Sequence, residues 1–339
     1  MKGIRITKKE ANNVRKKLLK EDILSKKFKA RNDENYVYFP IKTECDDTTI
    51  ESLLNEYPYE YGDYEFEKAS YRPQNFRDYL EDIPEQLVDE VTKSFDVIGD
   101  IVIIEVPPEL ETKKHQIAQA VLKFTRRKSV YCKKSKVSGV RRTRKLEYLS
   151  GEESLETTHR EFGLRYRLNP STVYFSPRLA TERSRITSQV NNGEIIIDFF
   201  AGIASFGINI AKKHDVTIYS VDINPEAIRY AHENIKLNNL VGNVIPILGD
   251  INDVIVDLPM ADRILMNLPG YSKNFLNLAV NHLKKGGILN YYEFSNSEET
   301  VINRIREASG TRKVEIEDVR RVRSQSPGIY HMGVDARIY

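Results

Sequence analysis

Three aspartates follow three successive apolar segments in the C-terminal half of the chain. Asp198 follows a run of three isoleucines, Asp222 lies within the segment 217–224, and Asp250 ends the segment 244–250. Each segment has the length and composition of a buried strand. Because the carboxyl ends of neighbouring parallel strands meet at one edge of a sheet, we expect these carboxylates to surround one ligand.

The turn after the first of these strands indicates which ligand. It ends at Gly202 and lacks the GxGxxG pattern that cradles a pyrophosphate, which argues against a dinucleotide-dependent dehydrogenase. Asp222 follows by about 20 residues, the spacing of an acid that binds ribose hydroxyls. Asp250 is placed for an adenine amino group. The pattern predicts an adenosine pocket without a phosphate site, as S-adenosylmethionine requires. Its expected cofactor-binding residues are Asp198, Ala201, Gly202, Asp222, Ile223, Asp250 and Ile251.

The elements that position these residues alternate between strands and helices. Helical stretches at 203–214 and 225–240 separate the first three strands, and further strands are expected at 263–269 and 287–294. Such alternation predicts a mostly parallel, doubly wound α/β sheet of Rossmann-like type, which we assign to residues 171–339. The last two strand-like segments, 313–324 and 331–339, suggest a C-terminal hairpin.

The preceding residues form two smaller units in this interpretation. Residues 1–68 are expected to be a small α/β domain, and residues 69–170 an α+β domain with an apolar strand region at 95–106 and a helix at 115–124. The stretch 123–145 contains eleven Lys or Arg and no acidic residue. Because two aromatic residues lie among these cations, we interpret it as an RNA-binding surface, although a solvated charged face would give the same pattern.

Composition excludes several other classes. Two distant cysteines and six scattered histidines predict neither a disulfide framework nor a metal site. No apolar stretch is long enough to cross a membrane, and the N-terminus lacks the apolar core of a signal peptide. We therefore expect a cytoplasmic protein.

Five segments together resemble one family. These are 142–152, 173–186, 198–208, 245–250 and 266–269, and they are similar to the archaeal and eukaryotic tRNA (guanine-37-N1) methyltransferases over nearly the whole chain. The resemblance implies a class I methyltransferase domain, S-adenosylmethionine as cofactor, tRNA as partner, a monomeric enzyme without metal, and an N-terminal domain that recognises tRNA. The segments 200–206 and 324–328 depart from the family pattern, and we assign no function to the second.

Two residues acquire catalytic roles from this resemblance. Guanine N1 carries a proton at neutral pH, so a general base must remove it before N1 can attack a methyl group. Glu182 matches the family's base, and Arg144 matches the cation that stabilises charge on O6. The alternatives are that Arg144 contacts phosphate and that Glu182 forms a salt bridge with Arg183 or Arg185.

The remaining residues implied by the resemblance surround the substrates. Asn267 and Pro269 would hold the flipped guanine against the methyl donor, and Asn267 would also bind the cofactor. Tyr174 and Arg178 would line the cofactor and base pocket, and Arg183 would contact the methionyl carboxylate. Three other functions remain open at this point: additional C7 methylation of the wyosine precursor 4-demethylwyosine, methylation of guanine N2 or adenine N6, and RNA binding by an inactive scaffold.

Overall fold

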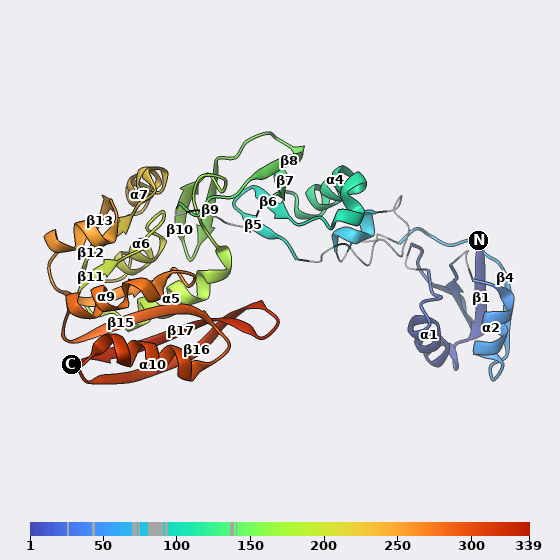
Figure 1. Ribbon diagram of the computed structural model, residues 1–339. Coiled ribbons are helices and arrows are strands. Elements are labelled where there is room, and N and C mark those ends of the chain that lie inside the picture. Colours follow the sequence, from blue (N-terminus) through green and yellow to red (C-terminus); the bar gives the residue numbers. More distant parts are fainter. Residues whose placement is uncertain are drawn as a thin grey trace. The chain divides into compact units, whose positions relative to one another are not determined.

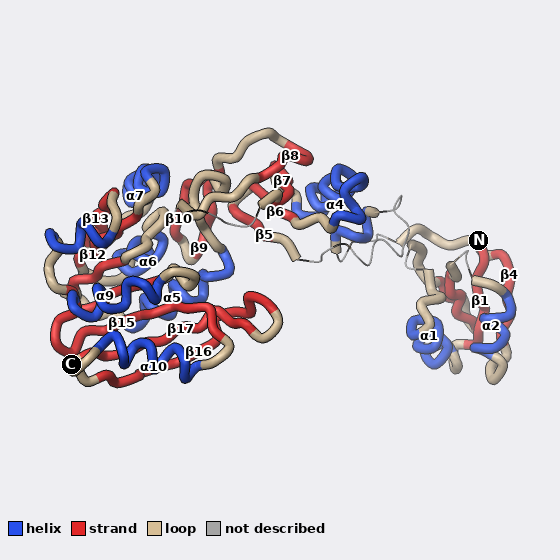
Figure 2. Tube along the Cα trace, in the orientation of Figure 1, coloured by secondary structure: helices blue, strands red, loops and turns tan. Residues whose placement is uncertain are grey.

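The computed structural model describes residues 1–25, 27–42, 45–69, 73, 75–80, 91, 94–135, 139 and 141–339 (Figures 1 and 2). The chain divides into two compact units, 1–78 and 79–339. The boundary that we expected near residue 170 therefore falls inside the second unit. Residues 136–138 and 140 of the basic stretch lie outside the described residues. Among the residues that are described, no helix is long and apolar enough to span a membrane.

The first unit is a four-stranded antiparallel sheet in the order β2-β3-β1-β4 with two helices. Side chains that alternate along β1, such as Ile4 and Ile6, are buried against Val14 and Leu18 of the first helix. The unit therefore has a core of its own. Its elements are β1 (Lys2–Thr7), α1 (Ala11–Lys20), β2 (Arg31–Asn32), β3 (Tyr36–Pro40), α2 (Asp47–Leu54) and β4 (Tyr59–Asp63).

The second unit begins with a four-stranded sheet in the order β5-β6-β7-β8 and a hairpin. The apolar region 95–106 folds as two strands around a turn at Gly99–Asp100, as its sequence predicts; Gly99 has φ +56°. Helix α4 packs against β7 and β8. The elements are β5 (Asp96–Ile98), β6 (Ile101–Ile104), α4 (Lys114–Thr125), β7 (Ser129–Lys133), β8 (Leu146–Gly151), β9 (Thr157–Glu161) and β10 (Leu164–Leu168).

A seven-stranded sheet in the order β13-β12-β11-β14-β15-β17-β16 follows. The first five strands are parallel, and β17 pairs antiparallel with β15 and β16. The doubly wound sheet and the C-terminal hairpin are thus confirmed. The strands are β11 (Ile195–Asp198), β12 (Thr217–Asp222), β13 (Asn243–Leu248), β14 (Ala261–Met266), β15 (Leu283–Ser295), β16 (Val314–Ser326) and β17 (Ile329–Ile338).

Helices cover both faces of this sheet. Ile196 belongs to the hydrophobic core beneath α5, α6 and α7, whereas its neighbour Ile197 belongs to the core beneath α8, α9 and α10. Because both faces are covered, a continuous isoleucine run suits β11. The first core continues through the hairpin into the four-stranded sheet, which explains why residues 79–339 form one unit. The helices are α5 (Ala180–Gln189), α6 (Ser205–Ala211), α7 (Pro225–Leu237), α8 (Ile251–Val254), α9 (Leu276–His282) and α10 (Glu298–Ser309).

Candidate active site

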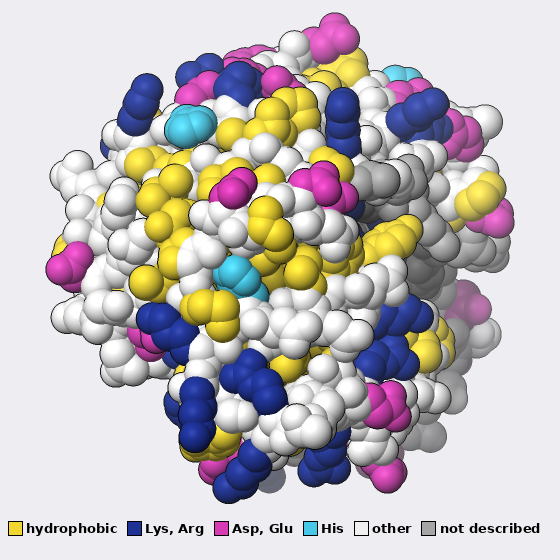
Figure 3. Space-filling view, turned by 60° about the vertical axis from the view of Figure 1, so that its left-hand side comes forward, with side chains coloured by type: hydrophobic (Ala, Val, Ile, Leu, Met, Phe, Trp, Pro, Cys, Tyr) yellow, Lys and Arg dark blue, Asp and Glu magenta, His cyan; other side chains and the backbone are white. Residues whose placement is uncertain are grey.

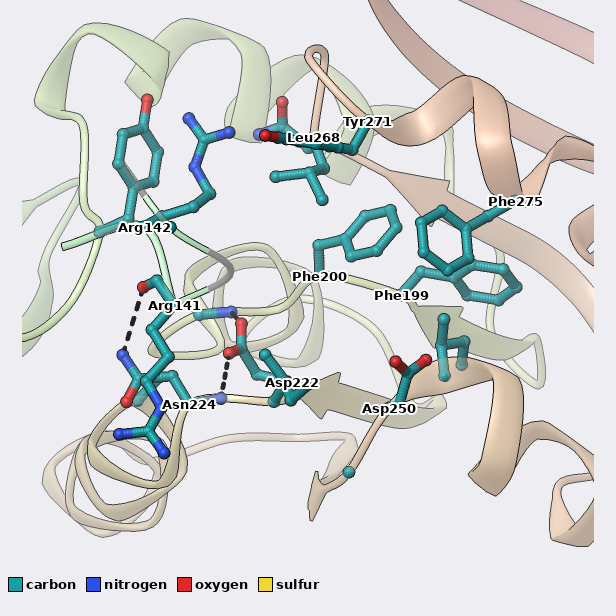
Figure 4. A pocket seen from close by; sticks show the side chains of 18 of the residues that line it. Arg141, Arg142, Phe199, Phe200, Asp222, Asn224, Asp250, Leu268, Tyr271 and Phe275 are labelled. Atoms are coloured by element: carbon teal, nitrogen blue, oxygen red, sulfur yellow. Dashed lines mark hydrogen bonds between the residues drawn. The ribbon is translucent and has the colours of Figure 1, made fainter. Parts of the chain in front are cut away.

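A cavity of about 380 Å³ opens at the carboxyl ends of the parallel strands. It lies where β11 is flanked by β12 on one side and β14 on the other, which is the point where such sheets bind ligands. Figure 4 shows aromatic rings on one side of the cavity and two arginines on the other. Seven of the residues expected from the sequence line it: Tyr174, Gly202, Asp222, Ile223, Asp250, Ile251 and Asn267.

Asp222 braces the turn that forms one wall of this cavity. Its Oδ2 accepts a hydrogen bond from the Gly202 backbone N–H at 2.7 Å, and its Oδ1 accepts one from that of Asn224 at 2.9 Å. Burial raises the pKa of the Asp222 carboxyl. Gly202 has φ +55°, a conformation that favours glycine. The turn and the acid are therefore fixed together, as an adenosine site requires.

Asp198 lies behind this wall and does not itself line the cavity. It is 1% exposed, and its Oδ2 has no hydrogen-bond partner among the described residues. Burial raises the pKa of this carboxyl to about 7. A buried carboxylate oxygen without a donor is unfavourable unless a ligand supplies one. Because Asp198 does not line the cavity, the fit to S-adenosylmethionine rests on the acid and the glycine turn that do, Asp222 and Gly202.

Asn267 presents a second unsatisfied atom to the cavity. Its Oδ1 is buried and lacks a hydrogen-bond partner within the described parts of the chain. The following loop is fixed, because Leu268 N–H donates to Ser272 Oγ at 3.2 Å and Phe294 N–H donates to the Pro269 carbonyl at 3.2 Å. Pro269 therefore belongs to this loop without lining the cavity itself. A rigid amide with a free acceptor is suited to bind a polar ligand edge.

Arg144 does not line the cavity, but it interacts electrostatically with Tyr174, which does. It is partly buried and makes no hydrogen bond or ion pair with any residue that the structure describes. Burial lowers the pKa of its guanidinium, partly offset by Asp96 and Tyr174. Arg178 also does not line the cavity, but unlike Arg144 it has a partner, because its Nε donates to Asp96 Oδ1 at 2.6 Å. Arg144 is thus a cation that is available to a ligand.

Glu182 is enclosed between α5 and the C-terminal strands. It is 6% exposed and does not line the cavity. Arg185, Arg320 and the Tyr292 hydroxyl all donate hydrogen bonds to its carboxylate. Of the two salt bridges considered from the sequence, the structure contains the one with Arg185. Because three side chains already donate to this carboxylate, Glu182 can accept a proton only if one of these hydrogen bonds is broken or shared.

Arg183 does not face the cavity, contrary to what the resemblance implies. It is 1% exposed, and its Nε donates to Glu161 Oε1 of β9 at 2.8 Å. Its Nη2 also donates to the Ser176 carbonyl at 3.2 Å. All of its polar contacts therefore lie inside the protein, and we propose no contact with the cofactor's carboxylate.

Sequence reasoning missed part of the cavity. Its aromatic side is formed by Phe199, Phe200 and Phe275, and the last two rings have their centres 5.2 Å apart. Arg141 and Arg142 approach from the basic stretch, and the Arg142 guanidinium lies 4.6 Å from the centre of the Tyr174 ring. The two phenylalanines adjacent to Asp198 were a usable signal, whereas nothing local to the basic stretch indicates that it reaches a cofactor site.

Comparisons with known proteins identify the family. Residues 157–317 match the TRM5/TYW2 methyltransferase domain, residues 76–154 the TYW2 N-terminal domain, and residues 3–50 the tRNA methyltransferase 5 N-terminal domain. The chain is 38% identical to the tRNA (guanine(37)-N(1))-methyltransferase Trm5b of Pyrococcus abyssi over 99% of this chain and 98% of that protein. The chain belongs to the TRM5/TYW2 methyltransferase family. The family and the fold class inferred from the sequence are thus confirmed.

Two further relatives of the TRM5/TYW2 family are informative. The solved complex of aTrm5 with tRNALeu has a TM-score of 0.74 and 34% identity, and the match covers 99% of each chain. The tRNA 4-demethylwyosine(37)-methyltransferase Taw21 of Saccharolobus solfataricus is 34% identical over 73% of this chain and 95% of that protein. The likeness to the first relative therefore extends over more of the chain.

Replacing Asp198 by Asn should change how stability depends on pH. The ordinary pKa of 3.8 rises to about 7 in the folded protein, so folding is favoured when Asp198 is protonated and this contribution is lost as pH rises from about 4 to about 7. Above that range the charged group costs on the order of 4 kcal/mol in the protein without cofactor.

Urea unfolding of this TRM5/TYW2 family member at pH 4.5 and pH 8 tests the expectation. The stability that Asp198→Asn gains relative to wild type should be larger at pH 8 than at pH 4.5. For the exposed Asp215→Asn, the difference from wild type should be the same at both pH values. If Asp198→Asn and wild type differ in unfolding free energy by the same amount at both pH values, the pKa of Asp198 is not raised in the folded protein.

Replacing Arg183 by Met should destabilise the fold and spare cofactor binding. The change leaves the Glu161 carboxylate buried without its ion-pair partner, which costs about 3–5 kcal/mol. Urea unfolding measures this loss, and calorimetry should give an unchanged affinity for S-adenosylmethionine. Adding Glu161→Gln should recover part of the stability. Loss of cofactor affinity with unchanged stability would instead restore the role that the resemblance implies.

Proposed function

We propose that the protein is a tRNA methyltransferase that transfers the methyl group of S-adenosylmethionine to N1 of guanosine 37, next to the anticodon. The observation that carries this proposal is the Arg144 guanidinium, which is partly buried beside Tyr174 and has no partner among the described residues. Such a cation suits an oxygen that becomes negatively charged during the reaction, as guanine O6 does when N1 loses its proton. The full-length likeness to an enzyme with this activity supports the same conclusion.

The cavity at the strand ends would hold the cofactor. Asp222 and Asp250 would bind its ribose and adenine, and Gly202 lets it approach the backbone. Bound S-adenosylmethionine supplies an electrophilic methyl group on a positively charged sulfur. Because the leaving group is already activated, the protein needs only to position and deprotonate the nucleophile.

The nucleophile is prepared by one residue of α5 and two residues from loops. Glu182 takes the proton from N1, Arg144 stabilises the charge that spreads to O6, and Asn267 accepts a hydrogen bond from the guanine edge. The partners of Glu182 keep it in one orientation, and the fixed Asn267 loop limits how the base can rotate. Positioning of this kind and general base catalysis together account for the chemistry.

The tRNA must deliver its base out of the anticodon-loop stack. Extrusion costs a few kcal/mol, which contacts with phosphates offset. Arg127 and Lys128 at the end of α4 have exposed side chains and only 4.0 Å contacts with Asp100. Lys and Arg side chains also gather on the lower part of one face of the molecule (Figure 3). In this proposal the enzyme is a cytoplasmic monomer.

Methylation of unmodified tRNA with tritiated cofactor, followed by nucleoside mass spectrometry, tests the function. We expect 1-methylguanosine from a transcript with guanosine 37 and no product when adenosine replaces it. N2-methylguanosine or an N6-methylated adenosine would overturn the proposal. A transcript carrying 4-demethylwyosine tests the additional C7 activity. The relative with that activity resembles a smaller part of this chain, so we expect at most slow reaction there.

A further inference from the structure

Side chains from the two strands that flank β17 meet the carboxylate of Glu182. Tyr292 on β15 pairs with Gly333 on β17, and Gly333 pairs with Arg320 on β16. Gly333 has no side chain, so Tyr292 and Arg320 approach each other above it. A Cβ at this position would lie 3.0 Å from Arg320 Nη2 and 3.2 Å from Tyr292 Cε1. The pairing of β17 with β15 on one side and β16 on the other thus brings two hydrogen-bond donors to one carboxylate.

The two oxygens of Glu182 are not equivalent. Oε1 accepts hydrogen bonds from the Tyr292 hydroxyl at 2.6 Å, from Arg185 Nη2 at 2.8 Å and from Arg320 Nη2. Oε2 has only longer contacts, 3.1 Å to Arg185 Nε and 3.3 Å to Arg320 Nε. Both Nε groups also reach Oε1 at 3.2 Å, so they are shared between the two oxygens. Oε1 has three donors of its own, whereas Oε2 has none, and Oε2 is therefore the oxygen that can more easily exchange a shared donor for a proton.

We infer that Tyr292 is a positioning residue that anchors Oε1 of Glu182 and leaves Oε2 as the atom that takes the N1 proton. This inference rests on the proposed function, in which Glu182 is the general base. In the step, the N1–H bond breaks and its electron pair stays on the purine, where it spreads to O6. A new O–H bond forms at Oε2.

The hydrogen bond from Tyr292 can be tested without changing the charges around Glu182. Burial, together with the neighbouring carboxylate, raises the pKa of the Tyr292 hydroxyl well above its ordinary value, so it remains a donor. Arg185 and Arg320 contribute two positive charges, and Glu182, Asp335 and the more exposed Asp318 contribute three negative ones. Replacing Tyr292 by Phe removes one donor and leaves this balance unchanged.

The neighbouring tyrosine is a matched control. Tyr291 is 0% exposed and Tyr292 is 1% exposed, and the Tyr291 hydroxyl donates to Glu293 Oε2 at 2.8 Å, away from Glu182. Each Phe variant therefore loses one buried hydrogen bond to a carboxylate. We expect Tyr292→Phe to lower kcat with saturating tRNA about tenfold, with KM for tRNA unchanged. Tyr291→Phe should stay within about twofold of wild type.

A modified substrate separates positioning from a structural effect. In tRNA with 6-thioguanine at position 37 the N1 proton is more acidic, so correct placement of the base matters less. The loss in kcat that Tyr292→Phe shows relative to wild type should therefore be smaller on this substrate. Gly333→Ala, which pushes Tyr292 and Arg320 apart, should show the same two effects in weaker form. An equal deficit on both substrates would overturn the inference.

Glu182→Gln distinguishes failure of this inference from failure of the proposed function. If the wild-type protein forms no 1-methylguanosine, the proposed function fails. If Glu182→Gln forms 1-methylguanosine at the wild-type rate, the base is another group, so the anchoring inference fails while methylation of N1 stands. If Glu182→Gln is inactive while Tyr292→Phe behaves like Tyr291→Phe, only the anchoring role is wrong. If Tyr292→Phe does not fold, as judged by circular dichroism, Gly333→Ala decides the question, and wild-type kinetics in that variant would overturn the inference.

Discussion

Replacing Glu182 by Gln is expected to lower the rate of 1-methylguanosine formation by about 10²–10⁴-fold. The amide has nearly the same shape as the carboxylate but cannot take the N1 proton. Single-turnover methylation of a tRNA with guanosine 37, under saturating cofactor and enzyme, measures the chemical step. Calorimetry should show unchanged affinity for S-adenosylmethionine, because Glu182 does not line the cavity.

Glu293→Gln provides the control for this change. Both glutamates are 6% exposed, and each accepts hydrogen bonds from a tyrosine hydroxyl and an arginine. The two variants should lose similar stability, but only Glu182→Gln should lose activity. Comparable rates of 1-methylguanosine formation in both variants would exclude Glu182 as the base. An enzyme that methylates an exocyclic amine would also tolerate Glu182→Gln, but its product would be N2-methylguanosine or an N6-methylated adenosine.

Replacing Arg144 by Ala is expected to lower kcat by about 10²–10³-fold, the loss seen when one donor to a developing oxyanion is removed. The guanidinium has no partner among the described side chains, so its removal leaves no buried acid unpaired and should hardly affect stability. Steady-state kinetics with tRNA measures the effect, and thermal unfolding checks the fold.

Salt dependence separates this role from a phosphate contact. Removing a residue that binds phosphate weakens tRNA affinity and reduces the salt dependence of that affinity, whereas removing a residue that stabilises O6 lowers kcat. The neighbouring exposed Lys145→Ala serves as the comparison and should change only affinity. If Arg144→Ala raises KM, flattens the salt dependence and leaves kcat unchanged, the phosphate interpretation is correct.

Local sequence patterns determined the architecture around the cofactor cavity. The continuous isoleucine run of β11 identifies a strand that is buried on both faces, and the alternating helices identify a parallel sheet. Asp222 at a strand end and Gly202 in the preceding turn could be placed together without coordinates, because parallel strands align their carboxyl ends. These features depend on residues close in sequence and on general sheet geometry.

The partners of buried charges were decided only by the tertiary structure. Glu182 meets Tyr292 and Arg320, which lie 110 and 138 residues away. Arg183, adjacent to it in sequence, turns to Glu161 on another sheet. Successive helical residues point in different directions, so neighbours in a motif meet different elements. The sequence motif predicted that Glu182 and Arg183 both lie in the active site. It contains no information on the distant strands that each residue contacts.

In the basic stretch 123–145, too, the sequence indicated the number of cations, whereas the tertiary structure decided which partner each of them has. Its composition indicated an excess of cations, but Lys134 is neutralised by Glu111 from a distant segment, Arg142 lies over the Tyr174 ring at the cavity, and Arg144 is left without a partner among the described residues. A charge count records how many cations a segment has. Which of them remains available for a substrate depends on the acids that the fold brings near, and that is set by strand register and packing over long sequence distances.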